Sequence, residues 1–121
     1  MAPSALALPM AWVAFELVRS HWPAGGMAWF VLGHSQAPYA PDHGVSYLIQ
    51  IADVFGDYGV SFVVAMSNGV IVDALTLPWR QPRPGGERRL NRTIALGLAL
   101  WAFAMVASIA YGHHRVKDTD A

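Results

Sequence analysis

A run of 19 residues without a charged side chain constrains the fold of this chain more than any other feature. The run extends from Thr93 to Tyr111 and reads TIALGLALWAFAMVASIAY. As an α-helix it would be roughly 28 Å long, close to the hydrocarbon thickness of a bilayer. Its alanines and glycine would let another helix approach closely. The run therefore predicts a transmembrane helix rather than the buried helix of a soluble protein.

The composition of the whole chain agrees with this prediction. Of its 121 residues, 55% are hydrophobic and 13% are charged, whereas a typical soluble domain is about 25% charged. A soluble domain of this size has too much surface for its volume to hide so many apolar side chains. The formal net charge is zero, which removes the electrostatic case for nucleic-acid binding. A soluble helical domain is thus the least favoured class.

A second transmembrane helix is expected upstream, over Tyr58–Leu77. Its polar side chains, at Ser67, Asn68 and Asp73, are costly in lipid and are expected to face protein or water.

The first candidate helix, Leu6–His21, is the weakest, because Glu16 and Arg19 fall in its last turns. Pro9 suits a first-turn position, which predicts that the helix begins there. Glu16 and Arg19 are three residues apart and share one helix face. They are expected either to form a structural ion pair or to contact a lipid head group or a partner domain.

The stretch between the first two helices is rich in glycine and proline and contains two short apolar runs, Met27–Leu32 and Val45–Ala52. Both runs are too short to span a bilayer. They are predicted to form half-helices or segments that lie at the interface, where protein or water satisfies their backbone.

Five arginines lie between Arg80 and Arg92, opposed by a single acidic residue, Glu87. A loop this short and basic is expected to stay in the cytoplasm. The predicted fold is therefore an all-α integral membrane protein with about three transmembrane helices. Its parts are a first transmembrane helix (1–21), an extra-cytoplasmic interfacial segment (22–57), a second helix (58–79), a cytoplasmic arginine-rich loop (80–92), a third helix (93–111) and an extra-cytoplasmic tail (112–121).

The residues alone offer no catalytic constellation and no metal or cofactor site. The chain contains no cysteine, so it has no cysteine nucleophile and no thiolate ligand. His113 and His114 are adjacent, so on a helix they diverge and make a poor metal pair. No phosphate loop, nucleophile elbow or dinucleotide fingerprint is present.

One short segment combines an apolar wall with hydrogen-bonding groups, as an amphipathic ligand site requires. It reads GMAWFVLGHSQ, from Gly26 to Gln36. Trp29, Gly33, Ser35 and Gln36 are predicted to line a groove that admits an acyl chain and holds its head group. The alternative for Trp29 is simple anchoring at the membrane interface.

Three ordered segments resemble the membrane portion of the apolipoprotein N-acyltransferase family: PMAWVAFELVR, GGMAWFVLGHSQ and QIADVFGDYGVSF. The family pattern has Trp followed by Glu-x-x-Arg on one helix, then a turn leading to Leu-Gly-Tyr-Ser-Gln, then a Gly-x-Tyr-Gly-Val-Ser-Phe-like helix start. This chain departs from the pattern at Met27-Ala28, where the family often has Phe-Pro, at His34, which replaces the tyrosine, and at Asp57, in the Gly-x-Tyr-Gly stretch. The matching positions are Trp12, Glu16, Arg19, Trp29, Leu32, Gly33, Ser35, Gln36, Gly56, Tyr58, Gly59, Val60, Ser61 and Phe62.

The resemblance implies part of a bacterial inner-membrane enzyme that transfers an acyl chain from a phospholipid donor to a lipoprotein acceptor, at its N-terminal S-diacylglyceryl-cysteine. Such enzymes carry a nitrilase-like domain outside the membrane, with a Glu-Lys-Cys triad that forms a thioester. Because this chain has no cysteine, it is expected to lack that domain and to be inactive alone. The substrate-binding residues that the resemblance and the segment above suggest are Glu16, Arg19, Trp29, Gly33, Ser35 and Gln36. A small non-enzymatic membrane protein that binds lipid or stabilises a partner is the alternative.

Overall fold

The structure, a computed structural model, describes residues 3–22, 26, 31–37, 46–76, 79 and 86–119. Within these ranges every regular element is helical, which confirms the predicted all-α class. The elements in chain order are α1 (Ser4–His21), the 3-10 helices η1 (Leu32–Gln36) and η3 (Leu48–Ile51), α2 (Ala52–Thr76) and α3 (Glu87–Thr119).

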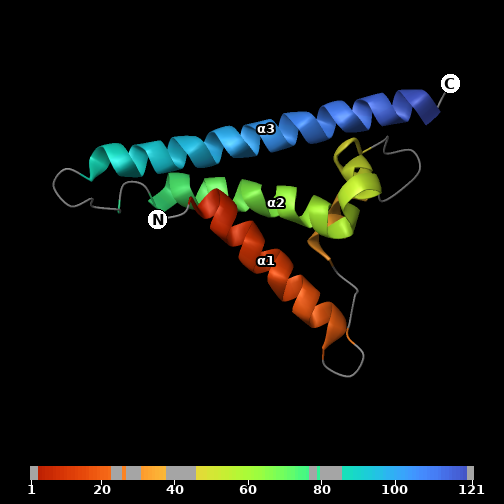
Figure 1. The fold of residues 1–121 in the computed structure, drawn as a ribbon, viewed down its shortest axis with the longest axis horizontal. Coiled ribbons are helices and arrows are strands. Elements are labelled where there is room, and N and C mark those ends of the chain that lie inside the picture. The colour runs from red at the N-terminus through yellow and green to blue at the C-terminus, as the bar shows by residue number, and fades with distance from the viewer. Residues whose placement is uncertain are drawn as a thin grey trace.

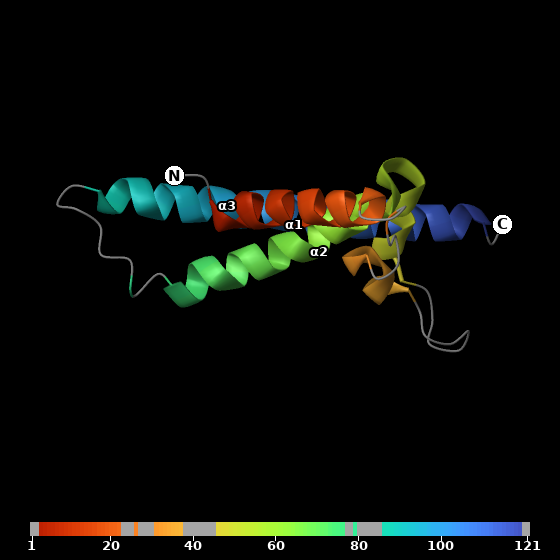
Figure 2. The same cartoon turned by 90° about the horizontal axis from the view of Figure 1, so that it is seen from below.

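The helix α2 lies between the other two (Figure 1), and the view along the long axis shows the order α3, α2, α1. α3 and α2 run in parallel in projection (Figure 1), whereas α1 crosses α2 near its own first turn and then diverges from it. Seen from below, α1 overlies α3 while α2 runs off at an angle (Figure 2). The three helices therefore form a closed end at the crossing and an open V between α1 and α2 at the other end.

Close backbone approach and a buried carboxylate hold the closed end together. A Cβ atom on Gly69 of α2 would lie 2.6 Å from Ala5 Cα, so only glycine lets the helices cross here. Asp73, 3% exposed, accepts a hydrogen bond from the backbone N–H of Ser4 at 3.0 Å. An acidic group at a helix N-terminus satisfies an orphan amide and complements the helix dipole. The polar residue in an apolar helix thus contacts protein, as the sequence predicts.

The prediction that the first helix begins at Pro9 is wrong, because α1 begins at Ser4 and contains Pro9 as a buried interior residue. A proline inside a helix loses one backbone hydrogen bond. Here Asp73 caps the helix by accepting a hydrogen bond from the Ser4 N–H. The N–H groups of Leu6 and Ala7 both donate to the Pro3 carbonyl at 3.0 Å. These contacts with the rest of the fold set the helix start upstream of the proline.

A polar contact and a small apolar cluster join α2 to its neighbours. The indole N–H of Trp101 on α3 donates to Ser67 Oγ at 2.9 Å. Towards the open end, Ile51 of η3 packs with Val60 and Val63 of α2 in the buried core. Ser67, like Asp73, therefore meets a protein partner inside the apolar span.

The helix α2 contains an elbow at Gly56, where φ is 65° and ψ is −174°. Residues with a Cβ avoid this region of backbone space, so glycine is required for its dihedral freedom. A Cβ on Gly56 would meet no atom within 4 Å, so space is not the reason. The elbow turns η3 and the first turn of α2 away from the straight part of the helix, which starts at Asp57.

Two segments are long and apolar enough to cross a membrane, Leu48–Thr76 and Leu90–Thr119. α3 has 33 residues, about 50 Å as a straight helix, so its ends project beyond a hydrocarbon layer of about 30 Å. The apolar run Thr93–Tyr111 is therefore only the middle of the helix. The helix continues beyond the apolar run at both ends, through charged and polar residues.

Candidate functional site

The 3-10 helix η1 occupies the open V between α1 and α2 and consists of Leu32–Gln36, with sequence LGHSQ. It is the end of the segment that the sequence singles out as an amphipathic site. Its first residues face the helices, since Gly33 is buried, whereas His34 and Ser35 are exposed. The two halves of η1 therefore have different surroundings.

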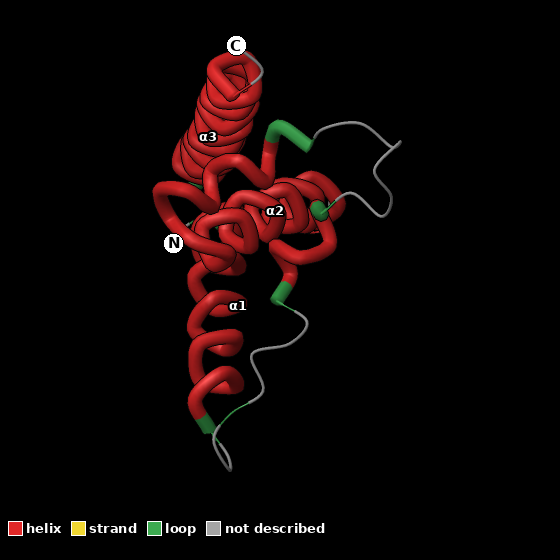
Figure 3. Tube along the Cα trace, turned by 90° about the vertical axis from the view of Figure 1, so that its right-hand side faces the viewer, coloured by secondary structure: helices red, strands yellow, loops and turns green. Residues whose placement is uncertain are grey.

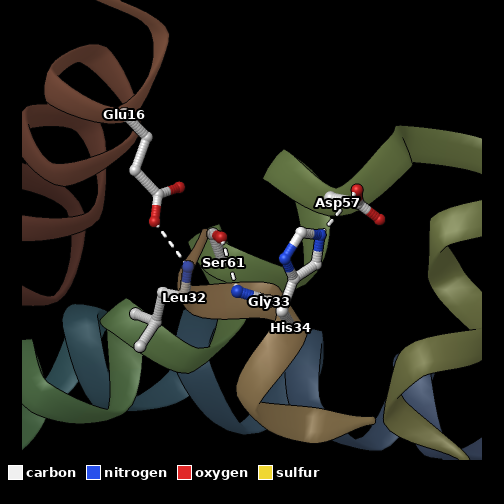
Figure 4. Close-up of polar contacts among 6 residues, drawn as sticks. All are labelled: Glu16, Leu32, Gly33, His34, Asp57 and Ser61. Carbon is white, nitrogen blue, oxygen red and sulfur yellow. Dashed lines mark hydrogen bonds and ion pairs between the residues drawn. The ribbon is translucent and has the colours of Figure 1, made fainter. Parts of the chain in front are cut away.

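Two neighbouring backbone amides at the start of η1 are each satisfied by a side chain from a different helix (Figure 4). Glu16 Oε1 on α1 accepts from the Leu32 N–H at 2.6 Å, and Ser61 Oγ on α2 accepts from the Gly33 N–H at 2.8 Å. Glu16 is 2% exposed and Ser61 is fully buried. Buried amides without a partner are costly in an apolar environment. These two side chains therefore allow an irregular segment to lie between apolar helices.

The carboxylate of Glu16 is itself oriented by its own helix. The indole N–H of Trp12, one turn earlier on α1, donates to the same Oε1 atom at 2.9 Å. The other oxygen, Oε2, is buried, and none of the residues that the structure describes forms a hydrogen bond with it. Trp12 and Leu32 thus hold one oxygen from two sides and fix the carboxylate towards η1.

Gly33 is required by close packing against α2. A Cβ at this position would lie 2.6 Å from the Asp57 carbonyl oxygen and 3.1 Å from Val60 Cβ. The backbone of η1 therefore lies directly on the first turn of the straight part of α2. A side chain here would push η1 away from Ser61.

The exposed half of η1 presents a connected set of polar groups. His34 Nε2 lies 3.1 Å from Asp57 Oδ2, and both side chains are about half exposed. Ser35 Oγ donates to the Leu32 carbonyl at 2.7 Å and accepts from Gln36 Nε2 at 3.1 Å. These residues form a polar surface beside apolar helices, the chemistry that holds a charged or hydrogen-bonding head group.

The structure assigns the predicted site residues to different roles. Glu16 is buried and bonds to the backbone of η1, whereas Ser35 and Gln36 lie on the polar surface. Arg19, half-buried, lies three residues beyond Glu16 on α1. Trp29 lies outside the described residues.

Sequence reasoning did not assign a role to Ser61 or to the pair of His34 and Asp57. Ser61 is one of the positions that match the family pattern, but nothing in its spacing indicates that it bonds to an amide 28 residues away. His34 stands where the family pattern has tyrosine, and it contacts Asp57, which fills the variable position of Gly-x-Tyr-Gly. The replacement of the tyrosine by His34 is therefore the signal that the sequence offers for this pair.

Comparison with known proteins identifies the family. The model of the apolipoprotein N-acyltransferase N-terminal domain matches residues 1–70, which include α1, η1 and most of α2. The chain belongs to the apolipoprotein N-acyltransferase family. The match includes Glu16, Gly33 and Ser61, so the family region coincides with the residues that build the η1 site.

Named apolipoprotein N-acyltransferases from three bacteria are similar to this chain. The protein of Geobacter metallireducens is 32% identical over 112 residues, which is 92% of this chain and 19% of the relative. That of Methylococcus capsulatus is 35% identical over 95 residues, 78% of this chain and 16% of the relative. That of Rhodopirellula baltica is 37% identical over 73 residues, 60% of this chain and 12% of the relative. The chain thus spans about a fifth or less of each relative, and no solved structure matches it.

The groups that the described part of η1 presents are suited to binding and positioning. The 121 residues include no cysteine, and the described residues contain no group of His, Asp and Glu side chains arranged to hold a metal ion. What the site offers is a fixed backbone segment with hydrogen-bonding side chains on its exposed half. Such an arrangement can bind and orient a polar group next to apolar helices.

Proposed function

We propose that this chain is the membrane part of an enzyme that transfers an acyl chain from a phospholipid to the N-terminal S-diacylglyceryl-cysteine of bacterial lipoproteins. The acyl group would be carried on a cysteine outside these 121 residues. The part described here would bind and orient the lipids through the exposed half of η1. The residues proposed to face the head group are His34, Ser35 and Gln36, supported by Gly33.

The observation that carries this proposal is the double anchoring of η1. Glu16 and Ser61 come from two helices and bond to consecutive amides, which leaves the following side chains exposed and the backbone fixed. A polar surface held rigidly beside an apolar one suits an amphiphilic substrate, because positioning reduces the entropy lost in the reaction.

We also propose that the chain crosses the bacterial inner membrane three times, with η1 at the outer face. Arg88 and Arg92 lie in the first turns of α3, at the same end of the molecule as the start of α1 (Figure 1). Arginine-rich loops stay in the cytoplasm. The opposite end, with η1, η3 and the end of α3, would then face outward, where lipoprotein precursors are displayed.

Two single-cysteine variants on α3 test this orientation without background, because the chain has no cysteine of its own. Arg88 and Lys117 are both exposed, one near each end of the helix. In spheroplasts, a maleimide that cannot cross the bilayer should label Lys117→Cys at once and Arg88→Cys only after permeabilisation. The reverse pattern, or equal labelling, would contradict the proposed orientation.

A chimera tests the activity. The aligned segment of the Geobacter metallireducens relative would be replaced by this chain, and the N-terminus of a lipoprotein would be analysed by mass spectrometry in cells that depend on the chimera. We expect an N-acylated lipoprotein, as with the unmodified relative. A chimera that inserts into the membrane but leaves lipoproteins without the N-acyl chain would refute the proposal.

The matched pair for this assay is Glu16→Ala and Leu17→Ala. Glu16 holds the Leu32 amide, whereas its neighbour Leu17 is 42% exposed on α1. We expect the first substitution to reduce acyl transfer strongly and the second to have little effect. Equal activity of the two variants would remove η1 from the mechanism.

A further inference from the structure

The helix α2 exposes a third face that neither α1 nor α3 covers. Ala65, Gly69 and Asp73 are buried, whereas Asn68, Ile71, Val72 and Leu75 are exposed. The exposed fractions reach 53% for Ile71 and 70% for Leu75. On a helix, residues separated by three, four and seven positions share one face. The four exposed residues therefore form one stripe, called here the Asn68 face.

Asn68 lies near the middle of the span. It is eleven residues after Asp57, where the straight part of α2 begins, so it is about 16 Å along a segment of about 30 Å. Among the residues that the structure describes, no partner accepts or donates a hydrogen bond to its amide. An amide in hydrocarbon without a partner costs several kcal/mol in reference transfer experiments, on the order of 4.

Few occupants of this face could satisfy that amide. Acyl chains carry no hydrogen-bonding group at this depth, and the rest of the stripe is apolar. Asn offers one acceptor and two donors. The spacing of Asn68, Ile71 and Leu75 by three and four residues is that of a helix–helix seam in which one polar residue fixes the register. Polar side chains bond across helices in membranes in the same way.

We propose that the Asn68 face packs against another transmembrane helix of the same acyltransferase, one that presents a hydrogen-bonding side chain to Asn68 near the bilayer midplane. This inference rests on the proposed function. It is favoured by length, because the matched segment is 19% of the Geobacter metallireducens relative and most of that protein lies outside it. Asn68 then sets the register between this part of the membrane domain and the remainder.

Photo-crosslinking in the chimera tests the proposal. Ile71 would be replaced by p-benzoylphenylalanine, and the crosslinked product would be digested and mapped by mass spectrometry. We expect an adduct with a peptide from the relative's own apolar segments, within one polypeptide. The Asn68→Val variant should lower the yield several-fold, and Asn68→Gln should restore part of it, because glutamine keeps the amide.

Three outcomes would overturn the proposal. An adduct with phospholipid would mean that the face is exposed to lipid, and an adduct between two copies would make the partner a second molecule. An intramolecular adduct whose yield does not change in Asn68→Val would mean that the amide has no role in the contact. In each case, continued acyl transfer by the chimera would leave the proposed function intact, whereas loss of transfer with the expected adduct would refute only the function.

Discussion

At both ends of the molecule, a buried side chain satisfies a backbone amide at the start of a helical element, but the two ends differ in how much of that element is packed. At each end, a buried carboxylate accepts a hydrogen bond from the backbone N–H at the start of a helical element. Asp73 accepts from Ser4 of α1, and Glu16 accepts from Leu32 of η1. Both carboxylates are almost completely buried, at 3% and 2% exposure. Capping of an orphan amide is therefore a shared device of the fold.

The ends differ in what surrounds the capped element. At the closed end, Gly69 and Gly97 bring α1 against both other helices, and the contact is backbone on backbone at Gly69. At the open end only the first half of η1 is packed, and its second half carries exposed polar side chains. The comparison indicates that the closed end stabilises the fold and the open end presents a site. Each prediction below tests that division.

The largest effect is expected from Gly69→Ala at the closed end. The new Cβ would lie 2.6 Å from Ala5 Cα, and neither backbone can rotate away. The helices would separate, at a cost of about 3 kcal/mol in the free energy of unfolding. Titration with a denaturing detergent measures this cost, and Gly97→Ala should cost less, because its Cβ meets the Pro3 side chain instead. A stable Gly69→Ala variant would mean that the helices do not cross here.

A smaller loss of stability but a larger loss of activity is expected from Glu16→Ala at the open end. The substitution leaves the Leu32 and Trp12 N–H groups without their acceptor. It also removes a buried carboxylate whose Oε2 has no hydrogen-bond partner among the described residues. The net cost should be about 2 kcal/mol, with Glu16→Gln closer to the parent. The same detergent titration and the chimera assay check both quantities. Stability loss without a change in acyl transfer would assign Glu16 to the fold alone.

Asp73→Ala should lower the stability of the fold but leave the rate of acyl transfer unchanged. Loss of a helix N-terminal cap costs about 1 kcal/mol, and the residue lies at the end of the molecule opposite η1 (Figure 1). We expect the chimera to retain its rate of acyl transfer at a temperature where the variant is folded. Asp73→Asn, which keeps an acceptor for Ser4, should fall between the variant and the parent. A rate that drops as far as in Glu16→Ala would break the division between the ends.

The smallest effect on stability is expected from separating His34 and Asp57. Both side chains are about half exposed, so their contact should be worth less than about 1 kcal/mol and should weaken with salt. Asp57→Asn can be compared with the parent by detergent titration at low and high ionic strength. A loss of stability as large as that of Glu16→Ala would mean that the exposed half of η1 also stabilises the fold.

Much of the architecture follows from local sequence properties. The uncharged run Thr93–Tyr111 predicts α3, and the polar residues inside the second apolar segment predict contacts with protein, which Ser67 and Asp73 make. The incorrect prediction that the first helix begins at Pro9 also came from local sequence preference. Local preference places proline in the first turn, but a carboxylate 69 residues away caps Ser4 and sets the helix start.

The sequence by itself determined that this chain is helical, which parts of it are apolar enough for a membrane, and where a segment changes from apolar to polar. Those properties can be read residue by residue, because each depends on the free energy of moving a side chain from water to an apolar environment or on its neighbours in the sequence. Only the tertiary structure decided that Glu16 bonds to the Leu32 amide and that Ser61 bonds to the Gly33 amide. A buried hydrogen bond depends on two groups meeting in space, and residues 16 and 28 positions apart meet only after the helices have packed.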